Sequence, residues 1–280
     1  MRPGRDEKIL VSWNALMVKG MARAARVFGE PGWLVSAQRA VDFIRRNLWR
    51  NNRLLATYKD GKAHLNAYLD DYAFLLDALL ELMQTAFRRE DFDFARALAD
   101  CLLEQFEDRA DSNPGGFSFT SHDHEKLIHR TKSGHDNATP SGNGIAAFAL
   151  QRLGHLIGEP RYIDAAERAL RLFYAGLQRQ PGAHASLLTA LEEALAPPRI
   201  VILRGETTEL NTWQRTLAAR YRPDTLVIAL TGEAADLPPA LAKPMPSVGV
   251  NAWVCVGVSC LPLHADLGTI ERVLLNSSQK

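Results

Sequence analysis

Apolar residues recur at steps of three and four positions through the first two thirds of the chain. The first stripe lies within residues 13–28. Six further stripes cover residues 34–48, 69–83, 94–106, 145–156, 162–173 and 185–195, with breaks at Pro31-Gly32, Gly158 and Pro160. This spacing is typical of amphipathic helices that end at Gly or Pro. The pattern predicts seven helices arranged as hairpins. The first stripe consists of Trp13, Leu16, Met17, Gly20, Met21, Ala24 and Phe28.

The pattern changes after Pro197-Pro198. Residues 200–203, 225–230 and 248–258 are rich in the aliphatic side chains typical of strands, and helices are predicted near residues 209–221 and 266–275. We therefore predict a mainly α chain with two parts. A helical-hairpin part covers residues 1–196, and a small α/β part covers residues 197–280.

Charge and composition limit the classes of function. The 33 Lys and Arg residues nearly balance the 32 Asp and Glu residues, which argues against a general binder of nucleic acids or membrane surfaces. No apolar run has the length of a membrane span, and the N-terminal residues lack the pattern of a signal peptide. Three cysteines are too few for a disulfide framework. We expect a cytoplasmic protein.

The charges are unevenly distributed along the chain. Residues 1–60 contain twelve Lys and Arg against five Asp and Glu, while residues 61–130 contain seven against fourteen. We expect two faces that neutralise each other across the fold, with a basic docking face for an anionic partner as the alternative.

Cys255 and Cys260 are separated by four residues in a strand-like run. A redox motif more often has two intervening residues, and a zinc site needs further ligands. We expect buried reduced thiols, with a reversible disulfide or a metal site as alternatives.

Polar residues collect before the first, third, fifth and seventh predicted helices. If consecutive helices pack antiparallel, these four helices are parallel and their N-terminal ends meet at one end of the molecule. Unpaired N–H groups and partial positive charge would then face one shared cavity. The sequence thus predicts a site there. Its candidate residues are Lys8, Trp13, Asn14, His64, Tyr68, Asp70, Asp71, Phe117, Glu125, Lys132, His135, Asp136, Ser141, Asn143 and His184.

Some of these residues also have a purely structural interpretation. Asp70, Asp71, Ser141 and Asn143 are residue types that favour helix starts, so they can act as caps. His122 and His124 lack the helical spacing of a zinc pair, and the chain has no phosphate-binding glycine loop or dinucleotide fingerprint. We expect no metal site and no cofactor.

Several ordered motifs resemble one protein family over nearly the whole chain. Residues 2–16, with Trp13-Asn14, match its first motif, followed by Asp71-Tyr72-Ala73-Phe74, Gly115-Gly116-Phe117, Pro140-Ser141-Gly142-Asn143, residues 197–202, and the pair Cys255 and Cys260. The chain resembles the thioredoxin-domain proteins typified by the spermatogenesis-associated thioredoxin-like protein. It departs from their pattern at Glu7, Ala15 and Ser118.

The resemblance implies a fold. The helical part of this family is similar to six-hairpin glycosidases and N-acylglucosamine 2-epimerases, which form an (α/α) toroid. A full ring has six inner helices and this chain offers four, so we expect a partial toroid. Members of this family carry a thioredoxin-like domain, which we expect this chain to lack. The ring would be completed by hairpins encoded elsewhere or by another copy, so we expect self-association or a thioredoxin-like domain as partner.

The resemblance also implies a carbohydrate-directed protein with a small sugar as ligand. Hydrolysis would use two carboxylates, Asp70 or Asp71 with Asp136 or Glu125. Epimerisation would use His64 with His135 or His184 as bases. The candidate aromatic platforms are Trp13, Tyr68, Tyr72 and Phe117, and the other candidate binding residues are Lys8, Asn14, Lys132, Ser141 and Asn143.

Two other hypotheses remain open. The first is a non-catalytic scaffold or binding module that works with a thioredoxin-like domain. The second is thiol redox chemistry through Cys255 and Cys260.

Overall fold

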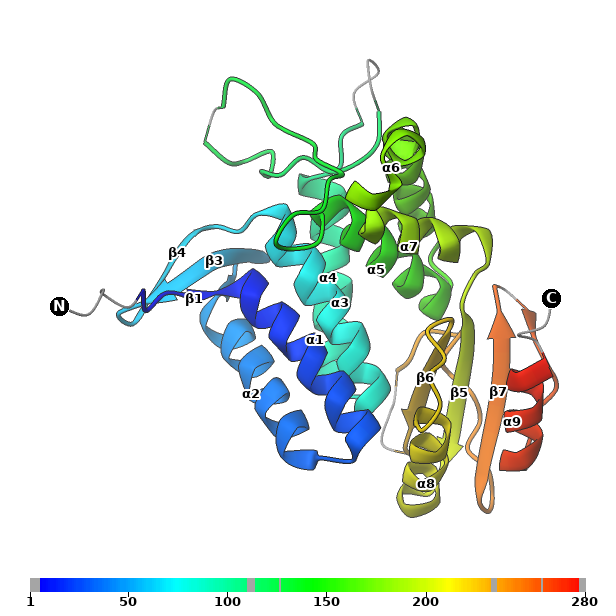
Figure 1. Cartoon of the computed structure of the whole chain (residues 1–280). Coiled ribbons are helices and arrows are strands. Elements are labelled where there is room, and N and C mark those ends of the chain that lie inside the picture. Colours follow the sequence, from blue (N-terminus) through cyan, green and yellow to red (C-terminus); the bar gives the residue numbers. More distant parts are fainter. Residues whose placement is uncertain (1–5, 110–113, 126, 233–235, 258, 277–280) are drawn as a thin grey trace.

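A computed structural model describes residues 6–109, 114–125, 127–232, 236–257 and 259–276 (Figure 1). Residues 2–5 of the first family-like motif and residue 258 of the third predicted strand lie outside this set. The seven predicted helices of the first part are confirmed. They are α1 (Val11–Phe28), α2 (Pro31–Asn47), α3 (Leu69–Thr85), α4 (Arg89–Gln105), α5 (Gly142–Ile157), α6 (Pro160–Arg179) and α7 (Ala185–Leu195), with a short 3₁₀ turn, η1 (Pro181–Ala183), before α7.

The helix boundaries follow from local chemistry. Pro31 and Pro160 occupy the first positions of α2 and α6, where a missing backbone N–H costs nothing. Gly29 and Gly158 end α1 and α5 with φ of 72° and 73°, the left-handed conformation that glycine adopts without strain. These residues turn the chain sharply, so α1 and α2 form one hairpin, and α5 and α6 form another.

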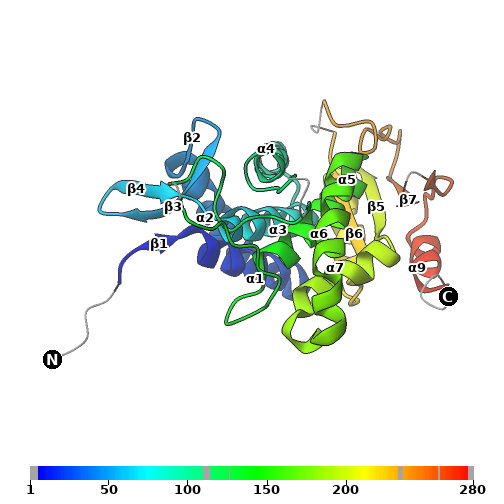
Figure 2. The same ribbon diagram turned by 90° about the horizontal axis from the view of Figure 1, so that it is seen from above.

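The hairpins are arranged as an arc. α1 packs on α3, α3 on α5 and α5 on α7, while α2, α4 and α6 each pack on the preceding helix from outside. The N-terminal ends of α1, α3 and α5 lie in the upper half of Figure 1, and Figure 2 shows the row from above. Among the described residues, four helices thus form the inner layer of an open α/α toroid.

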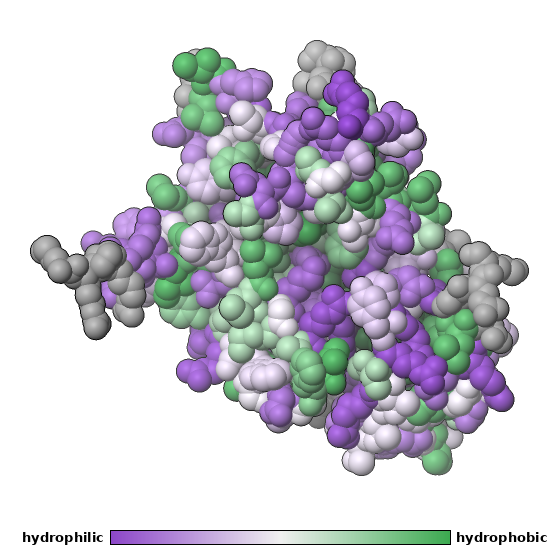
Figure 3. All heavy atoms as spheres, viewed as in Figure 1, coloured by the Kyte–Doolittle hydropathy of each residue, from purple (hydrophilic) through white to green (hydrophobic). Residues whose placement is uncertain are grey.

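Helix α1 does not bury the stripe that its sequence shows most clearly. The side chains packed against α2 and α3 are instead those of Val11, Ala15, Val18, Ala22 and Ala25. Trp13, Met17 and Phe28, from the sequence stripe, are 65%, 63% and 71% exposed. α1 lies at the front of Figure 1, and Figure 3 shows hydrophobic residues on that lower front face. The helix therefore has two apolar faces, and only one is covered by the described chain.

A small sheet that was not predicted from the sequence lies beside α1 and α2. Two of its turns contain consecutive residues with positive φ, Asn51-Asn52 and Asp60-Gly61, as two-residue hairpins require. The Asn-Asn and Asp-Gly pairs are the sequence signal from which the two hairpins could have been predicted. The antiparallel sheet consists of β1 (Ile9–Leu10), β2 (Trp49–Arg50), β3 (Arg53–Lys59) and β4 (Lys62–Asn66).

The second part is a mixed sheet with strand order β6-β5-β7-β8. β5 and β6 are parallel and joined through α8, and β7 runs antiparallel to β5. Ile200 and Ile202 face the helical core, while Val201 and Leu203 face a second core with α8 and α9. The sheet is therefore a layer between two cores. Its elements are β5 (Arg199–Gly205), α8 (Thr207–Ala218), β6 (Thr225–Leu230), β7 (Val250–Val256), β8 (Ser259–Cys260) and α9 (Leu267–Asn276).

The prediction of reduced thiols at Cys255 and Cys260 is wrong. The two residues form a disulfide that joins β7 to β8. They are direct partners in the antiparallel register of β7 and β8, with Cα atoms 3.9 Å apart. Cys255 is buried and Cys260 is exposed, whereas Cys101 is free and buried.

The predicted neutralisation between the basic and acidic segments is confirmed. Lys19 of α1 donates to Asp77 of α3 at 2.6 Å, and Arg26 pairs with Glu81 one turn further along. At the surface, Arg53 forms two hydrogen bonds to Asp123 at 2.6 and 2.8 Å. The uneven charge along the sequence thus becomes ion pairs between neighbouring elements.

None of the helices in the described ranges has the length and apolar character needed to cross a membrane. Within the same ranges, no group of three or more His, Cys, Asp or Glu side chains could hold a metal ion.

Replacing Tyr72 by Phe tests the hydrogen bond that connects the small sheet to α3. Tyr72 is fully buried, and its hydroxyl accepts a hydrogen bond from the Leu54 backbone N–H at 2.8 Å. Tyr72→Phe leaves that buried N–H without its partner, so we expect a loss of about 1–3 kcal/mol in unfolding free energy, measured by urea denaturation. Tyr174→Phe, at an exposed tyrosine, is the control and should change little. Equal effects of the two substitutions would contradict this account.

Candidate functional site

The N-terminal ends of the four inner helices lie side by side, as the sequence analysis expected. Asp71 of α3 accepts a hydrogen bond from the Ser12 backbone N–H of α1 at 2.9 Å. Asp136 accepts from the Ser141 N–H before α5 at 2.7 Å and from the Ser186 N–H of α7 at 2.9 Å. A Cβ on Gly142 would overlap Asp70, so α3 and α5 touch at their first turns. Carboxylates therefore join helix starts that are far apart in the sequence.

Asp71 has a structural role in this arrangement. It is buried, and its two oxygens accept from the Ser12 and Tyr68 backbone N–H groups, each at 2.9 Å. Burial raises the pKa of Asp71 to about 6, although the hydrogen bonds from Tyr68 and Ser12 oppose the rise. Both oxygens are occupied by backbone donors. The capping interpretation fits this geometry better than a catalytic one.

The surroundings of Asp70 differ from those of Asp71. It is half-buried, and none of the described residues donates a hydrogen bond to its carboxyl group. Burial, and then the negative charge of Asp71, raise the pKa of Asp70 to about 6. A half-buried carboxyl group with a raised pKa and no hydrogen-bond donor is suited to hold and release a proton near neutral pH.

Asp136 is held in its ionised form. Burial alone would raise its pKa, but hydrogen bonds from the Ser186 hydroxyl and from the Ser141 and Ser186 backbone N–H groups bring it below the ordinary value. The environments of Asp70 and Asp136 thus push their pKa values in opposite directions. When the environments of two carboxyl groups shift their pKa values apart in this way, one group can act as the acid while the other stays ionised.

The two carboxyl groups are close in space. Asp70 touches Gly142, and Asp136 accepts from the preceding residue, Ser141. Since consecutive Cα atoms are about 3.8 Å apart, the two carboxyl groups lie within about 12 Å of each other. This range includes the separations found in glycoside hydrolases.

The aromatic surface next to Asp70 consists of Tyr68 and Phe119. Their rings are stacked, with centroids 4.9 Å apart, and His124 lies 5.3 Å from Tyr68. The Leu69 N–H donates to the Phe119 carbonyl at 2.9 Å, which fixes this loop at the start of α3. Phe119 remains 41% exposed. Tyr68 was expected from the sequence, whereas Phe119 was missed; its signal was the Phe-Ser-Phe alternation at residues 117–119.

The prediction of Tyr72 and Phe117 as aromatic platforms is wrong. Both side chains are fully buried in the helical core. Tyr72 lies on the face of α3 that packs against Phe106, with ring centroids 5.0 Å apart. Phe117 anchors the loop before α5. No face of either ring is left for a ligand.

Ser141 and Asn143 hold the chain around the start of α5. Ser141 caps the helix by accepting from the Gly144 N–H at 3.3 Å. The Asn143 amide accepts from the Phe117 N–H at 2.7 Å and donates to the Phe117 carbonyl at 2.9 Å. Both side chains are buried and occupied by the protein itself. Their predicted contact with a substrate is replaced by contacts that shape the loop.

Three further candidates are occupied by neighbours on their own segments. Lys132 forms an ion pair with Asp108 at 2.8 Å, which closes the base of the long loop before α5. Lys8 is exposed and pairs with Asp6 at 3.3 Å. The Asn14 amide donates to the Leu10 carbonyl at 2.8 Å at the start of α1. These contacts account for the three side chains without a ligand.

The remaining candidates are not joined to the carboxylates by any described contact. His64 is an exposed residue of β4, and Glu125 is exposed in the long loop. Trp13 lies on the open face of α1. The His135 and His184 rings are in contact, with centroids 4.3 Å apart, and His184 is buried. None of the described contacts brings His64 together with His135 or His184, the pairs predicted to act as bases in an epimerisation.

A cleft of about 830 Å³ extends from this end into the inner side of the arc. At the helix starts its wall includes Asp136, Asn137, Thr139 and Ser186. Deeper in the cleft, Arg152 forms an ion pair with Glu193 and lies over the Phe148 ring, 3.9 Å from its centroid. The cleft thus has a polar mouth and a charged interior.

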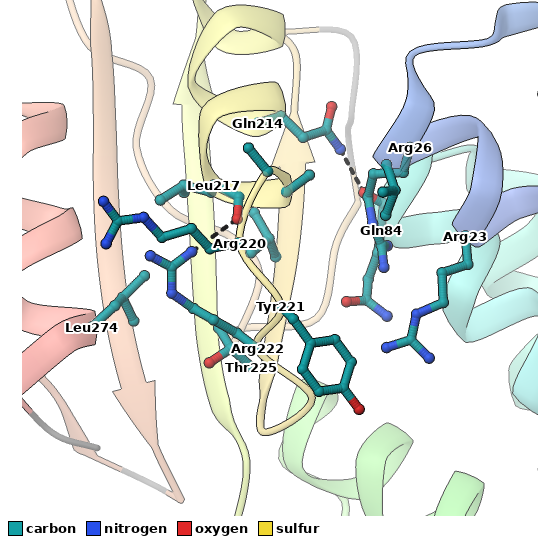
Figure 4. Close-up of a pocket in the computed structure, with 14 residues that line it drawn as sticks. Arg23, Arg26, Gln84, Gln214, Leu217, Arg220, Tyr221, Arg222, Thr225 and Leu274 are labelled. Carbon is teal, nitrogen blue, oxygen red and sulfur yellow. Dashed lines mark hydrogen bonds between the residues drawn. The ribbon is translucent and has the colours of Figure 1, made fainter. Parts of the chain in front are cut away.

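A smaller pocket of about 230 Å³ adjoins the far end of the cleft (Figure 4). Tyr221 points toward Arg23, whose guanidinium group lies 5.6 Å from the ring centroid. Gln214 of α8 donates a hydrogen bond to the Gln84 carbonyl of α3 at 2.6 Å. Arg23 and Tyr221 line both cavities. These contacts fix the α/β part as one wall of the inner space.

The charged residues of the cleft were not predicted from the sequence, because the candidate residues were taken only from the loops at the helix starts. The signal was the occurrence of charges inside otherwise apolar helices, such as Asp77 and Glu81 one turn apart in α3. Buried charges of this kind require partners, and the partners line a shared interior.

The chain is similar in sequence to spermatogenesis-associated protein 20. The human protein is 26% identical over 295 residues, covering 98% of this chain and 37% of the relative. The protein from Rattus norvegicus is 27% identical over 241 residues, covering 81% and 30%. The chain therefore spans about a third of the length of these relatives. No family model matches it.

Among solved structures, the chain is similar to the GH76 alpha-mannanase BT2949 from Bacteroides thetaiotaomicron. The TM-score is 0.54 at 11% sequence identity, and the match covers 84% of this chain and 66% of the mannanase. Cellobiose 2-epimerase from Spirochaeta thermophila aligns with 59% of this chain and 43% of its own at a TM-score of 0.48 and 20% identity. The mannanase match confirms the predicted six-hairpin-type (α/α) fold.

The same substitution at two adjacent residues should have different effects on stability. The folded-state pKa of Asp70 lies above its ordinary value of 3.8, so stability falls as pH rises from about 4 to about 6. Asp70→Asn removes this loss and should raise the unfolding free energy at pH 8 by about 1–2 kcal/mol, allowing for solvent access, with no gain at pH 4. Asp71→Asn removes the same pH-dependent loss, because the pKa of Asp71 is also raised to about 6, but it leaves one backbone N–H without an acceptor at a cost of about 1–3 kcal/mol. Its gain at pH 8 should therefore be absent or much smaller than that of Asp70→Asn.

Urea denaturation at pH 4 and pH 8 measures both effects. Asp164→Asn, at an exposed carboxylate, serves as the control for the loss of one charge. Destabilisation by Asp70→Asn at pH 8 would show that the Asp70 carboxylate is a structural group, like that of Asp71.

Proposed function

We propose that this chain carries a carbohydrate-directed active site that cleaves a glycosidic bond, with Asp70 as the proton donor. The observation that carries the proposal is the contrast between two nearby carboxyl groups. Asp70 has a raised pKa and no hydrogen-bond donor among the described residues, and Asp136 is kept ionised by three donors. Glycoside hydrolysis requires an acid and an ionised carboxylate beside the scissile bond.

Each carboxyl group has a defined task in this proposal. Protonated Asp70 donates its proton to the leaving oxygen as the glycosidic bond breaks. A solvent water molecule adds to the sugar carbon and loses a proton, which restores the protonated form of Asp70. Asp136, already bound by serine donors, stabilises the positive charge that develops on the sugar ring. Its oxygens are too heavily hydrogen-bonded to serve as a strong nucleophile, so an electrostatic role suits them better.

The surroundings supply the means to bind a sugar. The stacked pair Tyr68 and Phe119 offers a partly exposed aromatic face next to the start of α3. The cleft mouth adds the polar side chains of Asn137 and Thr139. Its volume of about 830 Å³ is large enough for more than one sugar unit. The fold shared with a GH76 alpha-mannanase agrees with a sugar ligand in class, without fixing its identity.

A non-catalytic role is the second candidate function. It is favoured by the number of candidate residues that the protein uses for itself: Asp71, Ser141, Asn143 and Lys132 are all occupied in caps, clamps or ion pairs. In this alternative the helical arc is a scaffold or binding module that works with a thioredoxin-like domain. A cytoplasmic location remains part of either proposal.

Activity assays with Asp70→Asn test the catalytic proposal. A panel of gluco-, manno- and galacto-configured oligosaccharides would first be screened by thermal shift and by product release. On unactivated oligosaccharides, Asp70→Asn should lower kcat about 10²–10⁴-fold, because the leaving oxygen loses its acid. On a 2,4-dinitrophenyl glycoside of the same sugar the loss should be much smaller, since that leaving group needs no proton. The wild-type kcat/KM should fall as pH rises through about 6.

Asp164→Asn is the matched control and should retain full activity. Phe119→Ala should weaken sugar binding with little effect on kcat. Equal losses by Asp70→Asn on activated and unactivated substrates would exclude Asp70 as the acid. If neither binding nor turnover is found with any sugar, the scaffold function is the one that stands.

A further inference from the structure

The open face of α1 is the largest departure from the usual segregation of apolar side chains in this molecule. The helix already buries one apolar face against α2 and α3, and a second face directs Lys19 and Arg26 to their partners on α3. The third face is apolar and uncovered by the described residues. It consists of Trp13, Met17, Gly20, Ala24 and Phe28, a set that we call the α1 stripe.

This stripe has the composition of a contact surface. None of its five residues is charged or capable of forming an ion pair. Figures 1 and 2 show α1 at the front and lower edge of the molecule, with no described helix outside it. A helix that is apolar on opposite sides is normally covered on both, and an exposed apolar stripe marks an interaction site.

The outer positions of the stripe are symmetric about a point near the middle of α1. Residues 13 and 28, and residues 17 and 24, are equally distant from a point between residues 20 and 21, and Gly20 lies beside that point. An antiparallel copy of the same helix would therefore place residue 13 opposite residue 28 and residue 17 opposite residue 24. Trp13 would meet Phe28 at the two ends, Met17 would face Ala24, and Gly20 would lie next to the centre. A two-fold interface requires this kind of self-complementarity.

We propose that a second copy of this chain covers the α1 stripe, with the two α1 helices packed antiparallel about a two-fold axis near Gly20. A Cβ built on Gly20 meets nothing within 4 Å, so the backbone at this point is open to close approach. Met17 then packs over Ala24 of the partner subunit, and Trp13 over Phe28 of the partner subunit. Small residues at a helix crossing allow the backbones to approach closely.

The area involved is sufficient for a dimer. Trp13, Met17 and Phe28 are each more than 60% exposed. Trp33, 42% exposed, extends the patch through its edge-to-face contact with Phe28, at a centroid distance of 6.1 Å. Together these side chains expose on the order of 500 Å² per copy, so about 1,000 Å² would be buried in the pair. This reaches the lower limit for a specific interface.

The proposed dimer leaves the cleft accessible. Lys19, Arg23 and the cleft lie on a different face of α1 from the stripe. Dimer formation therefore does not depend on the proposed glycosidic activity, and the tests of the two proposals are independent.

Sedimentation velocity and light scattering at 1–100 µM measure the oligomeric state. We expect a mass of about twice 31.1 kDa for the wild type. Met17→Glu should shift the species to a monomer, raising the dissociation constant by 100-fold or more, because two carboxylates would be buried at the interface. Val35→Glu is the control, since Val35 is an exposed apolar residue of α2 outside the stripe. Circular dichroism and thermal unfolding establish that both variants fold.

Cross-linking tests the geometry independently of charge. Gly20→Cys places a thiol near the proposed axis, and mild oxidation should convert most of the protein to a covalent dimer on a non-reducing gel. Val35→Cys should remain monomeric on the same gel. The native cysteines give little background, because Cys255 and Cys260 are paired and Cys101 is buried. A monomer at 100 µM, or a dimer that survives Met17→Glu and gives no Gly20→Cys cross-link, would overturn the proposal.

Discussion

The architecture depends on carboxylates that accept backbone N–H groups from helix starts distant in the sequence. Asp71 reaches Ser12, 59 residues away, and Asp136 reaches Ser186, 50 residues away. The first turn of each helix has unpaired donors and partial positive charge, so a buried carboxylate is favourable there. Because each carboxylate serves two chain segments, the inner helices are held with their beginnings together. The cleft and its polar mouth follow from that constraint.

The same constraint separates the polar residues into two groups. Asp71, Ser141 and Asn143 are occupied by the backbone that they organise, and their burial reflects this role. Asp70 is adjacent to them and shares their environment, yet none of the described residues donates to it. A group that is desolvated without compensation costs free energy in the folded state. Such a cost is more readily understood at a reactive position than at a structural one, and this is the physical basis of the proposed acid.

The three sides of helix α1 have different surroundings. One side is packed in the core, one supplies cations to acidic partners on α3, and one is left open. The ion pairs satisfy charges that would be costly inside the arc. The open side has no such compensation within the described chain, and the proposed second copy would cover its apolar residues.

The sequence by itself determined the helices, their hairpin order and the gathering of polar segments, because apolar periodicity and Gly or Pro boundaries are local properties. It also located Asp70, Asp71 and Asp136. It could not tell which of them is free, since that depends on backbone donors from residues 12, 141 and 186. Nor could it tell which apolar face of α1 is buried, or that Tyr72 packs inward. Tertiary structure decided these points, because burial and hydrogen bonding depend on neighbours that sequence spacing does not reveal.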